Sequence, residues 1–497
     1  MTTDRDRLRA IAIAAMRARG LEPGFAPDAL AEAAALRSAP TSTEEPVRDL
    51  RPLPWCSIDN DESRDLDQLS VITTAADGTR ALLVAVADVD AAVRRASAVD
   101  RHAAINTTSV YTPAAVFPML PERLSTDLTS LGEGDDRLAI VVDLRLGPDG
   151  RVTASDVYGA TVRNRAKLTY NGVDAWLSGE APLPAAAARV AGMDGQLRQQ
   201  DQAAQALAHA RHELGALEFE SAEAEFVFEG DRVHEVRRRA PNRAKALIEN
   251  LMIAANGAVA RFLEARRFPS LRRVVRSPER WDRIRDVAAG YGDELPAAAD
   301  SKALAAFLVR RQRAAPADFA DLSHTIIRLL GSGEYVVDPP GEEPPGVPSA
   351  AAALGAPPGH FGLAVRDYTH STAPNRRYPD LITQRLIKAA LAGHPSPYQI
   401  GELNALATHC MRQEDAANKV ERQVRKSAAA LVIESRVGER FEAIVTGASP
   451  KGTFVRVTSP PIEGKLIKGE HGLDVGDRVR VKLASVDVER GYIDFTV

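Results

Sequence analysis

The feature that most constrains this chain is an acidic segment set between apolar segments of strand length. Residues 58–69 read Ile-Asp-Asn-Asp-Glu-Ser-Arg-Asp-Leu-Asp-Gln-Leu, where five carboxylates fall within nine residues and only Arg64 offsets them. Residues 56–58 and 69–73 read as short strands, and residues 81–89 form an apolar run of buried-strand length. A group of carboxylates at the rim of a buried sheet is costly unless it holds a metal ion. The setting therefore favours a metal site.

The type of metal follows from the donor atoms. Hard carboxylate oxygens suit Mg²⁺, with Mn²⁺ as the alternative, rather than zinc or copper. An EF-hand that begins at Asp59 is excluded, because it needs glycine where Arg64 stands and glutamate where Ser70 stands. Asp65 and Asp67 are two residues apart, so in an extended segment they share one face. The simpler alternative is a solvated acidic loop, because charge runs usually lie at the surface.

Length and composition limit the class of protein. A chain of 497 residues with 45% hydrophobic residues has room for two to four domains. The two cysteines, Cys56 and Cys410, stand far apart, which argues against a disulfide framework and fits a reducing cytoplasm. Charge interrupts the N-terminal residues, and no run of 18 apolar residues occurs, so we expect neither a signal peptide nor a membrane span.

The chain divides into three predicted parts, giving an α+β fold. Residues 1–45 form a small helical module with helices at 4–19 and 27–38, either helix-turn-helix-like or a hairpin packed on the main body. Residues 46–436 form a large mixed α/β domain that follows a linker at 39–54. Residues 437–497 read as a five-stranded Greek-key barrel, an OB-fold. Within the large domain we expect helices at 91–106, 196–214, 241–267, 379–392 and 400–434, strands at 137–146 and 167–170, and an exposed insertion at 339–358.

Two observations favour a nucleic-acid partner, although the net charge of −4 does not. Residues 232–285 contain 15 Lys or Arg against 5 Asp or Glu, a stripe that suits a phosphate backbone. In the barrel, Phe454 stands beside Gly452 with Lys451 and Arg456 nearby, an arrangement that can stack a base. The alternatives are ordinary solvated helix faces for the basic stripe and a core position for Phe454.

A second chemical segment lies at residues 370–380, which read His-Ser-Thr-Ala-Pro-Asn-Arg-Arg-Tyr-Pro-Asp. Arg376 and Arg377 stand between prolines, in a loop that opens a helix, and Pro379 suits the first helical turn. Their fork-shaped donors and the helix dipole both favour a phosphate. A structural pair that bridges to the acidic loop is the alternative, and the two interpretations are compatible.

Several long motifs together resemble one family. Ile58-Asp-…-Asp65-Leu-Asp67, Val110-Tyr-Thr-Pro, Ala166-Lys-Leu-Thr-Tyr170, Gly359-His-Phe-Gly-Leu-Ala364 and Tyr368-Thr-His-Ser-Thr-Ala-Pro-Asn-Arg-Arg-Tyr-Pro-Asp380 occur in order across residues 55–435. They resemble the ribonuclease II/R family, processive 3′→5′ exoribonucleases with an RNB catalytic domain. The C-terminal residues, with Val475-Gly-Asp, resemble the S1 domain of that family.

The resemblance implies roles for individual residues. Asp59, Asp65 and Asp67 would belong to the Mg²⁺-binding catalytic cluster, with the amide oxygen of Gln68 as a further, uncharged metal ligand, and Arg376 would hold the scissile phosphate. The RNA contacts would come from Tyr111 and Phe219 by stacking, from Tyr170 and Glu249 at the 3′-terminal ribose, and from Arg377, Glu421 and Phe454.

The implied reaction is hydrolysis of single-stranded RNA, without sequence preference, to nucleoside 5′-monophosphates. One Mg²⁺ would activate water and a second would stabilise the leaving 3′-oxygen. We expect a monomer in the cytoplasm.

The sequence also departs from the family pattern. Gln68 stands where the family has a second adjacent aspartate, which leaves the number of metal ions open, with Asp61 or Glu62 as substitutes. The usual Ser-Pro-Ile reads Ala373-Pro-Asn here. The short helical module stands in place of paired cold-shock barrels, so we expect easier access for structured RNA. The rival interpretations are a catalytically impaired RNA-binding protein of the same fold, which Gln68 supports, and a transcriptional regulator led by the N-terminal helices.

Overall fold

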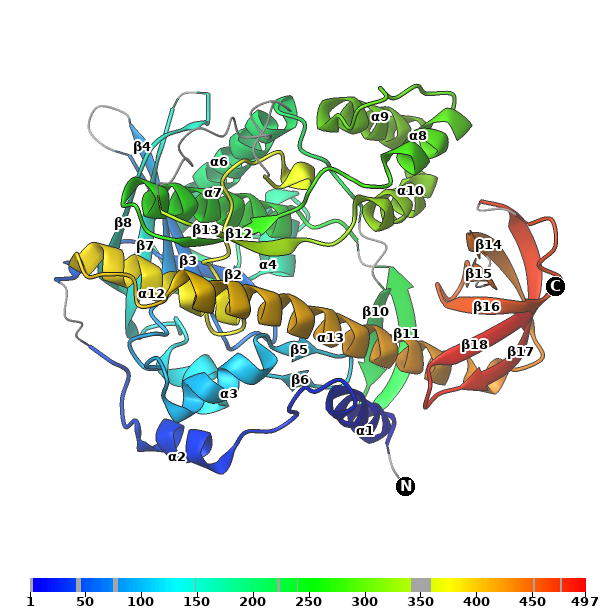
Figure 1. The fold of residues 1–497 in the computed structure, drawn as a ribbon, viewed down its shortest axis with the longest axis horizontal. Helices are drawn as coiled ribbons and strands as arrows, with labels where there is room; N and C mark the ends of the chain where they lie inside the picture. Colours follow the sequence, from blue (N-terminus) through cyan, green and yellow to red (C-terminus); the bar gives the residue numbers. More distant parts are fainter. Residues whose placement is uncertain are drawn as a thin grey trace.

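The chain forms a large mixed α/β body with a small β-barrel at one end (Figure 1). The computed structural model describes residues 3–41, 46–74, 79–147, 149–220, 224–238, 240–340, 359–449, 452–473 and 476–497. Lys451, Val475, Arg239 and most of the insertion expected at 339–358 lie outside these residues. The predicted α+β fold class is confirmed.

A seven-stranded sheet forms the centre of the body, in the order β1-β8-β7-β4-β3-β2-β9. Its strands are β1 Arg48–Asp49, β2 Cys56–Asp59, β3 Gln68–Thr74, β4 Arg80–Ala87, β7 Asp136–Leu146, β8 Val152–Arg163 and β9 Ala166–Thr169. All residues of β4 after Arg80 are buried, which explains why the sequence there is continuously apolar. β3 pairs antiparallel with β4, so the acidic segment ends at the entry to the buried sheet.

Helices cover this sheet and extend the body. They are α3 Ala98–Asn106, α4 Tyr170–Leu177, α5 Ala185–Ala188, α6 Met193–Glu213, α7 Arg243–Ala265, α8 Trp281–Gly290, α9 Ser301–Ala314, α10 Pro316–Leu330, α12 Tyr378–Ala392 and α13 Ile400–Ile433. The helix α7 packs against β7 and β8. By length and composition α7 could cross a membrane, but 67% of its apolar window is buried inside the protein, as in the core helix of a globular domain.

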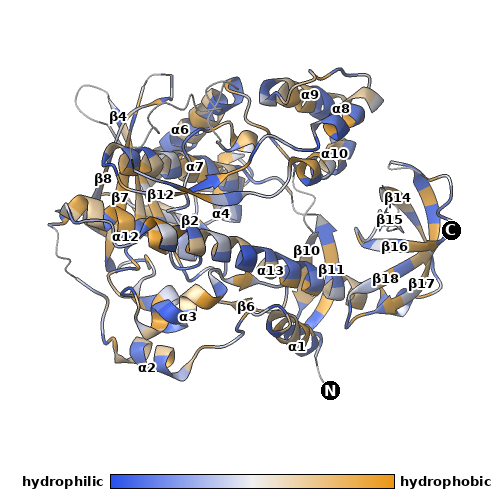
Figure 2. Ribbon diagram, in the orientation of Figure 1, coloured by the Kyte–Doolittle hydropathy of each residue, from blue (hydrophilic) through white to orange (hydrophobic). Residues whose placement is uncertain are grey.

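Shorter elements complete the body. They are the pairs β5 Val110–Tyr111 with β6 Val116–Phe117, β10 Ala224–Glu229 with β11 Arg232–Arg238, and β12 Ser270–Val274 with β13 Glu334–Asp338, and the single turns η1 Leu124–Leu128, η2 Phe361–Leu363 and η3 Glu434–Arg436. The long helix α13 runs from the body to the barrel (Figure 1). Hydrophobic and hydrophilic residues alternate along it, because only one side packs on the protein (Figure 2).

The C-terminal barrel is closed, in the order β14-β15-β16-β18-β17. Its strands are β14 Arg440–Ser449, β15 Gly452–Val457, β16 Glu463–Lys468, β17 Arg478–Asp487 and β18 Tyr492–Thr496. In β15 the side chains of Thr453, Val455 and Val457 are buried, whereas Phe454 between them is only half-buried. Because successive strand residues face opposite sides, Phe454 lies on the outer face of the barrel, so its interpretation as a core residue is wrong.

The two N-terminal helices form where the sequence predicts them. α1 Asp4–Arg17 begins with a capping box between Thr3 and Asp6, and Pro27 opens α2 Pro27–Ala35. α1 packs against α13 and β11, and α2 packs against α3. Both helices therefore rest on the main body, as the second expected arrangement has it, but on different elements rather than as a hairpin.

Two sequence-based expectations need correction. Residues 91–97 are not helical, because Ser97 caps α3 and Ala96 has a left-handed φ of 63°. The linker expected at 39–54 contains β1, which pairs with β8 at the sheet edge. The hairpin β10–β11 was not predicted, because its apolar residues complete a cluster formed with α1 and the barrel, which local sequence does not reveal.

Candidate active site and RNA interface

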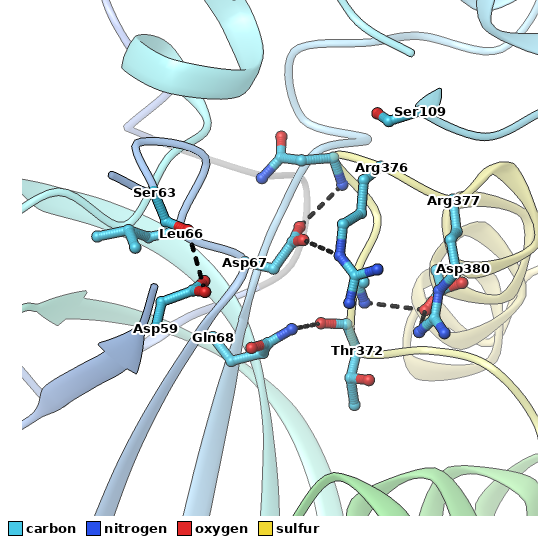
Figure 3. A network of polar contacts seen from close by, with 12 residues as sticks. Asp59, Ser63, Leu66, Asp67, Gln68, Ser109, Thr372, Arg376, Arg377 and Asp380 are labelled. Carbon is cyan, nitrogen blue, oxygen red and sulfur yellow. Dashed lines mark hydrogen bonds and ion pairs between the residues drawn. The ribbon is translucent and has the colours of Figure 1, made fainter. Parts of the chain in front are cut away.

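Asp67 is the most buried carboxylate of the acidic segment, with 3% of its side chain exposed. One carboxylate oxygen accepts a hydrogen bond from the backbone N–H of Asn375 at 2.9 Å. The other lies 3.4 Å from Nε of Arg376, whose side chain remains 40% exposed (Figure 3). Burial raises the pKa of Asp67 to about 7, and the charge of Arg376 opposes that shift. The structure thus brings the two predicted chemical segments into contact.

Asp59 and Asp65 complete the predicted acidic group. Asp59 ends β2, and its Oδ1 accepts hydrogen bonds from the Asn60 backbone N–H at 2.7 Å and from Ser63 Oγ at 3.0 Å (Figure 3). Burial and the nearby charge of Asp59 raise the pKa of Asp65, while Arg376 opposes the shift. Asp65 in turn raises the pKa of Asp67. The carboxylates are therefore close enough to repel one another.

The loop that carries the arginines is anchored on several sides. The backbone carbonyl of Arg376 accepts from the Ser109 N–H at 3.0 Å, so this loop adjoins the segment that leads to Tyr111. Arg377 turns away from Asp67 and donates to Asp380 at 2.7 Å (Figure 3). Asp380 is fully buried and also accepts from the backbone N–H of Ala373 at 2.8 Å. Arg377 thus supports the loop, and the sequence motif gave no separate signal for Asp380 as its partner.

Gln68 lies beside this loop. Its Nε2 donates to the backbone carbonyl of Thr372 at 2.5 Å (Figure 3). Asp61 and Glu62 are exposed, and Asp61 accepts a hydrogen bond from Asn171 at 2.9 Å. The structure therefore gives no support to either residue as a substitute for the missing aspartate.

Two tyrosines face the acidic group. Burial raises the pKa of the Tyr111 hydroxyl. The charge of Arg376 opposes this shift, and the charge of Asp65 adds to it. Burial raises the pKa of Tyr170 as well, with Asp59 adding to the shift. The Tyr111 backbone N–H donates to Glu421 of α13 at 2.8 Å. Tyr111 and Tyr170 are thus close enough to the carboxylates to feel their charge, and Glu421 contacts the backbone of Tyr111; the contacts of all three with RNA stay a prediction.

Glu249 belongs to α7, and Phe219 to the segment that follows α6. Glu249 is exposed on α7; desolvation by the surrounding protein and the charge of Glu218 raise its pKa, while Arg211 opposes the shift. Arg211 donates to the neighbouring Asn250 at 2.6 Å. Phe219 is half-buried against the hydrophobic cluster of α8–α10. Its role in base stacking stays a prediction.

Seven of the fifteen basic residues of the stripe at 232–285 form ion pairs within the protein. Arg272 contacts Glu264, Asp338 and Asp367, and Arg273 lies 2.7 Å from Glu414. The other ion pairs of this stripe are Arg237–Glu225, Arg243–Asp201, Arg276–Glu334, Arg283–Asp286 and Arg285–Asp282. This pairing favours the interpretation as solvated faces over a continuous track for phosphates.

The donor set can be tested against a divalent metal ion. Among the described residues, no group of three His, Cys, Asp or Glu side chains is already arranged to hold a metal. Asp59, Asp65 and Asp67 nevertheless offer hard oxygens whose mutual repulsion a divalent cation would relieve. The residues therefore fit Mg²⁺ or Mn²⁺ in their chemistry, provided that side-chain rotation brings the carboxylates together.

Comparisons with known sequences identify two domains in the chain. Residues 47–393 match the RNB domain, and residues 439–497 match the RNase II-type exonuclease C-terminal S1 domain. Ribonuclease R of Escherichia coli (strain K12) is 32% identical, over 90% of this chain and 57% of the relative. Ribonuclease R of Thermotoga maritima is 30% identical, over 96% of this chain and 68% of the relative. The chain thus spans little more than half the length of the Escherichia coli relative.

Solved structures share the fold. RNase R of Mycoplasma genitalium, in complex with ribose-methylated single-stranded RNA, matches with a TM-score of 0.84 at 23% identity, over 99% of this chain and 78% of that one. Yeast Ssd1, described as a pseudonuclease, matches with a TM-score of 0.67 at 16% identity, over 92% of this chain and 54% of that one. Since the RNB match covers more than half of the chain, this protein belongs to the RNB-domain family and carries a C-terminal S1 domain of the RNase II type.

Proposed function

We propose that this protein is a 3′→5′ exoribonuclease that hydrolyses single-stranded RNA to nucleoside 5′-monophosphates with Mg²⁺ or Mn²⁺. The observation that supports it most is the contact between Asp67 and Arg376, which come from distant segments. It joins an acidic group suited to a divalent cation with an exposed guanidinium suited to a phosphate. The Ribonuclease R relatives named above support the same activity.

The residues of the chain have the following roles in the reaction. Arg376 donates to the scissile phosphate and stabilises the charge that develops on it. Asp59, Asp65 and Asp67 would hold the divalent ion, which when bound supplies an activated water and neutralises charge. Asn375 and Arg376 fix the Asp67 carboxylate by the two contacts described above. Tyr111 and Phe219 stack on bases. Because every base has an aromatic face, this contact does not depend on the RNA sequence.

The proposal also covers the choice of RNA over DNA, the oligomeric state and the cellular compartment. Tyr170 and Glu249 contact the terminal ribose, where the 2′-hydroxyl distinguishes RNA from DNA. The enzyme acts as a monomer in the cytoplasm. Its two cysteines are buried free thiols, which fits a reducing compartment.

A labelled RNA tests the activity directly. With a 5′-labelled single strand and Mg²⁺, we expect stepwise shortening from the 3′ end and release of nucleoside 5′-monophosphates, both stopped by EDTA. Asp67→Asn should abolish turnover but keep RNA binding, because only the charge that holds the ion is removed. Asp143→Asn is the control, since Asp143 is a buried carboxylate of the same sheet whose partner is Arg145.

Two results would contradict the proposal. Internal cuts, or cleavage that persists in EDTA, would exclude a metal-dependent exonuclease. RNA binding by the wild-type protein without cleavage in either Mg²⁺ or Mn²⁺ would favour the catalytically impaired RNA-binding protein, which Gln68 and the similarity to a pseudonuclease support.

A further inference from the structure

The side-chain amide of Gln68 connects the acidic segment to the arginine loop. Its Nε2 donates to the carbonyl of Thr372, four residues before Arg376. A carboxylate at this position could not donate and would repel that carbonyl oxygen. Gln68 therefore holds the arginine loop before any metal ion binds, which an aspartate at this position could not do.

This hydrogen bond also fixes the orientation of the amide. Because the nitrogen donates to Thr372, the amide oxygen points away from that carbonyl, and in the view of Figure 3 it lies on the side of the amide nearer Asp59. An amide oxygen is a good ligand for Mg²⁺ or Mn²⁺ but carries no charge. Gln68 is thus placed to offer one neutral oxygen to an ion held by the carboxylates.

The charges of the site limit how many ions it can hold. Asp59, Asp65 and Asp67 carry three negative charges when ionised, and Arg376 next to Asp67 carries one positive charge. The remaining two negative charges match one divalent ion. Asp61 and Glu62 do not supply a further carboxylate, because they are exposed and Asp61 is bound to Asn171.

Donors of the protein itself also use part of the acceptor capacity of these carboxylates. Asn60 and Ser63 occupy Oδ1 of Asp59, and Asn375 and Arg376 contact both oxygens of Asp67. From these contacts we infer that the site takes a single divalent ion, with the Gln68 oxygen as a neutral ligand and the Gln68 nitrogen as a fixed link to the arginine loop. This inference rests on the proposed function, and it replaces the expectation of two Mg²⁺ ions.

Counting bound ions tests the inference without any turnover. Mn²⁺ is titrated into the full-length protein and followed by electron paramagnetic resonance, alone and with a cleavage-resistant phosphorothioate RNA. We expect one Mn²⁺ per chain in both conditions. Gln68→Glu should bind a second ion or hold the first at least tenfold more tightly, because it adds a negative charge. Gln68→Met should weaken the single ion several-fold, because it removes the oxygen.

Gln196→Glu is the matched control. Gln196 is a half-buried glutamine that also hydrogen-bonds backbone groups of β3, through Ile72, and it belongs to α6 outside the acidic group. This variant should bind Mn²⁺ as the wild type does. Two ions in the wild-type protein would overturn the inference, and so would unchanged Mn²⁺ affinity and stoichiometry in Gln68→Glu or unchanged affinity in Gln68→Met. A single bound ion without RNA cleavage would instead contradict the proposed function alone.

Discussion

At the scale of single residues, the two neighbouring arginines of the loop have different surroundings. Arg376 is partly exposed beside Asp67, whereas Arg377 neutralises Asp380, whose side chain is fully buried. Removing one partner of a buried ion pair leaves the other charge uncompensated. Arg377 is therefore placed to stabilise the fold as well as to serve the RNA contact that the motif implies.

We expect Arg377→Met to lower the free energy of unfolding by about 3 kcal/mol, in the range for breaking a buried pair. Urea denaturation checks this through the shift of the midpoint at an unchanged slope. Arg283→Met is the control, because its pair with Asp286 is exposed and should contribute less than about 0.5 kcal/mol. Equal losses in the two variants would show that Arg377 does not support the loop.

At the scale of elements, the short turn η2 depends on a histidine that must stay neutral. Nδ1 of His360 accepts a hydrogen bond from the backbone N–H of Leu363 at 3.1 Å, which requires an unprotonated nitrogen. Burial lowers the pKa of His360 to about 4, and the charge of Arg273 adds to the shift. His370 and the ring of Tyr368 also face it. Protonation of His360 would therefore oppose folding.

The sign of the pH effect follows from linkage. Below the unfolded pKa of 6.5 the unfolded chain binds a proton that the folded His360 does not, so stability is lost as the pH falls toward 4. From pH 7 to pH 5 this loss is about 2 kcal/mol. In His360→Gln the side chain still accepts a hydrogen bond but cannot be protonated. The free energy of unfolding of this variant, relative to wild type, should therefore rise by about 2 kcal/mol between pH 7 and pH 5. Comparing the two proteins cancels the opposite trend of Asp67, whose raised pKa favours folding as the pH falls.

Urea midpoints of both proteins at the two pH values provide the measurement. A stability difference that does not change with pH would mean that His360 has an ordinary pKa in the folded protein.

The helices and strands also show which features of the fold the sequence can predict. The apolar run of β4 and the helix α1 were predicted because their signals are local: a buried strand is apolar throughout, and an amphipathic helix repeats apolar residues at helical spacing. The hairpin β10–β11 was missed because its apolar face is completed by α1 and the barrel. Residues 91–97 look helical in isolation, but the carboxylate of Asp100 accepts from the backbone N–H of Ala96 and holds a turn there.

The candidate site also has parts that the sequence predicted and parts that it did not. The motifs placed Asp67 and Arg376 in one site, and the structure brings them together. The motifs could not predict that Arg377 pairs with Asp380 or that the amide of Gln68 reaches Thr372. Such partners depend on how a loop folds back over a sheet, and no residue spacing encodes that geometry.

At the scale of the whole molecule, the barrel contacts the body through several elements, α1 among them, where Arg7 lies 2.8 Å from Glu489. α13 runs into it, and Arg456 of β15 contacts Asp321 of α10. On the same strand, Phe454 lies on the outer face opposite Lys465 of β16, with Gly447 of β14 on its other side. Glycine on one side and a cation on the other leave the ring open to a nucleobase. The barrel should therefore add affinity for RNA without taking part in hydrolysis.

Phe454→Ala separates these two contributions. Losing one stacked base costs about 1–3 kcal/mol, so a long single-stranded RNA should bind roughly 5- to 150-fold more weakly. The single-turnover cleavage rate at saturating enzyme should stay unchanged, because the acidic group and Arg376 are untouched. Ile467→Ala is the control, since it removes an exposed apolar side chain of the same barrel that has no aromatic face. A loss of rate at saturation would mean that the barrel positions the RNA end, because weaker binding alone cannot slow a saturated enzyme.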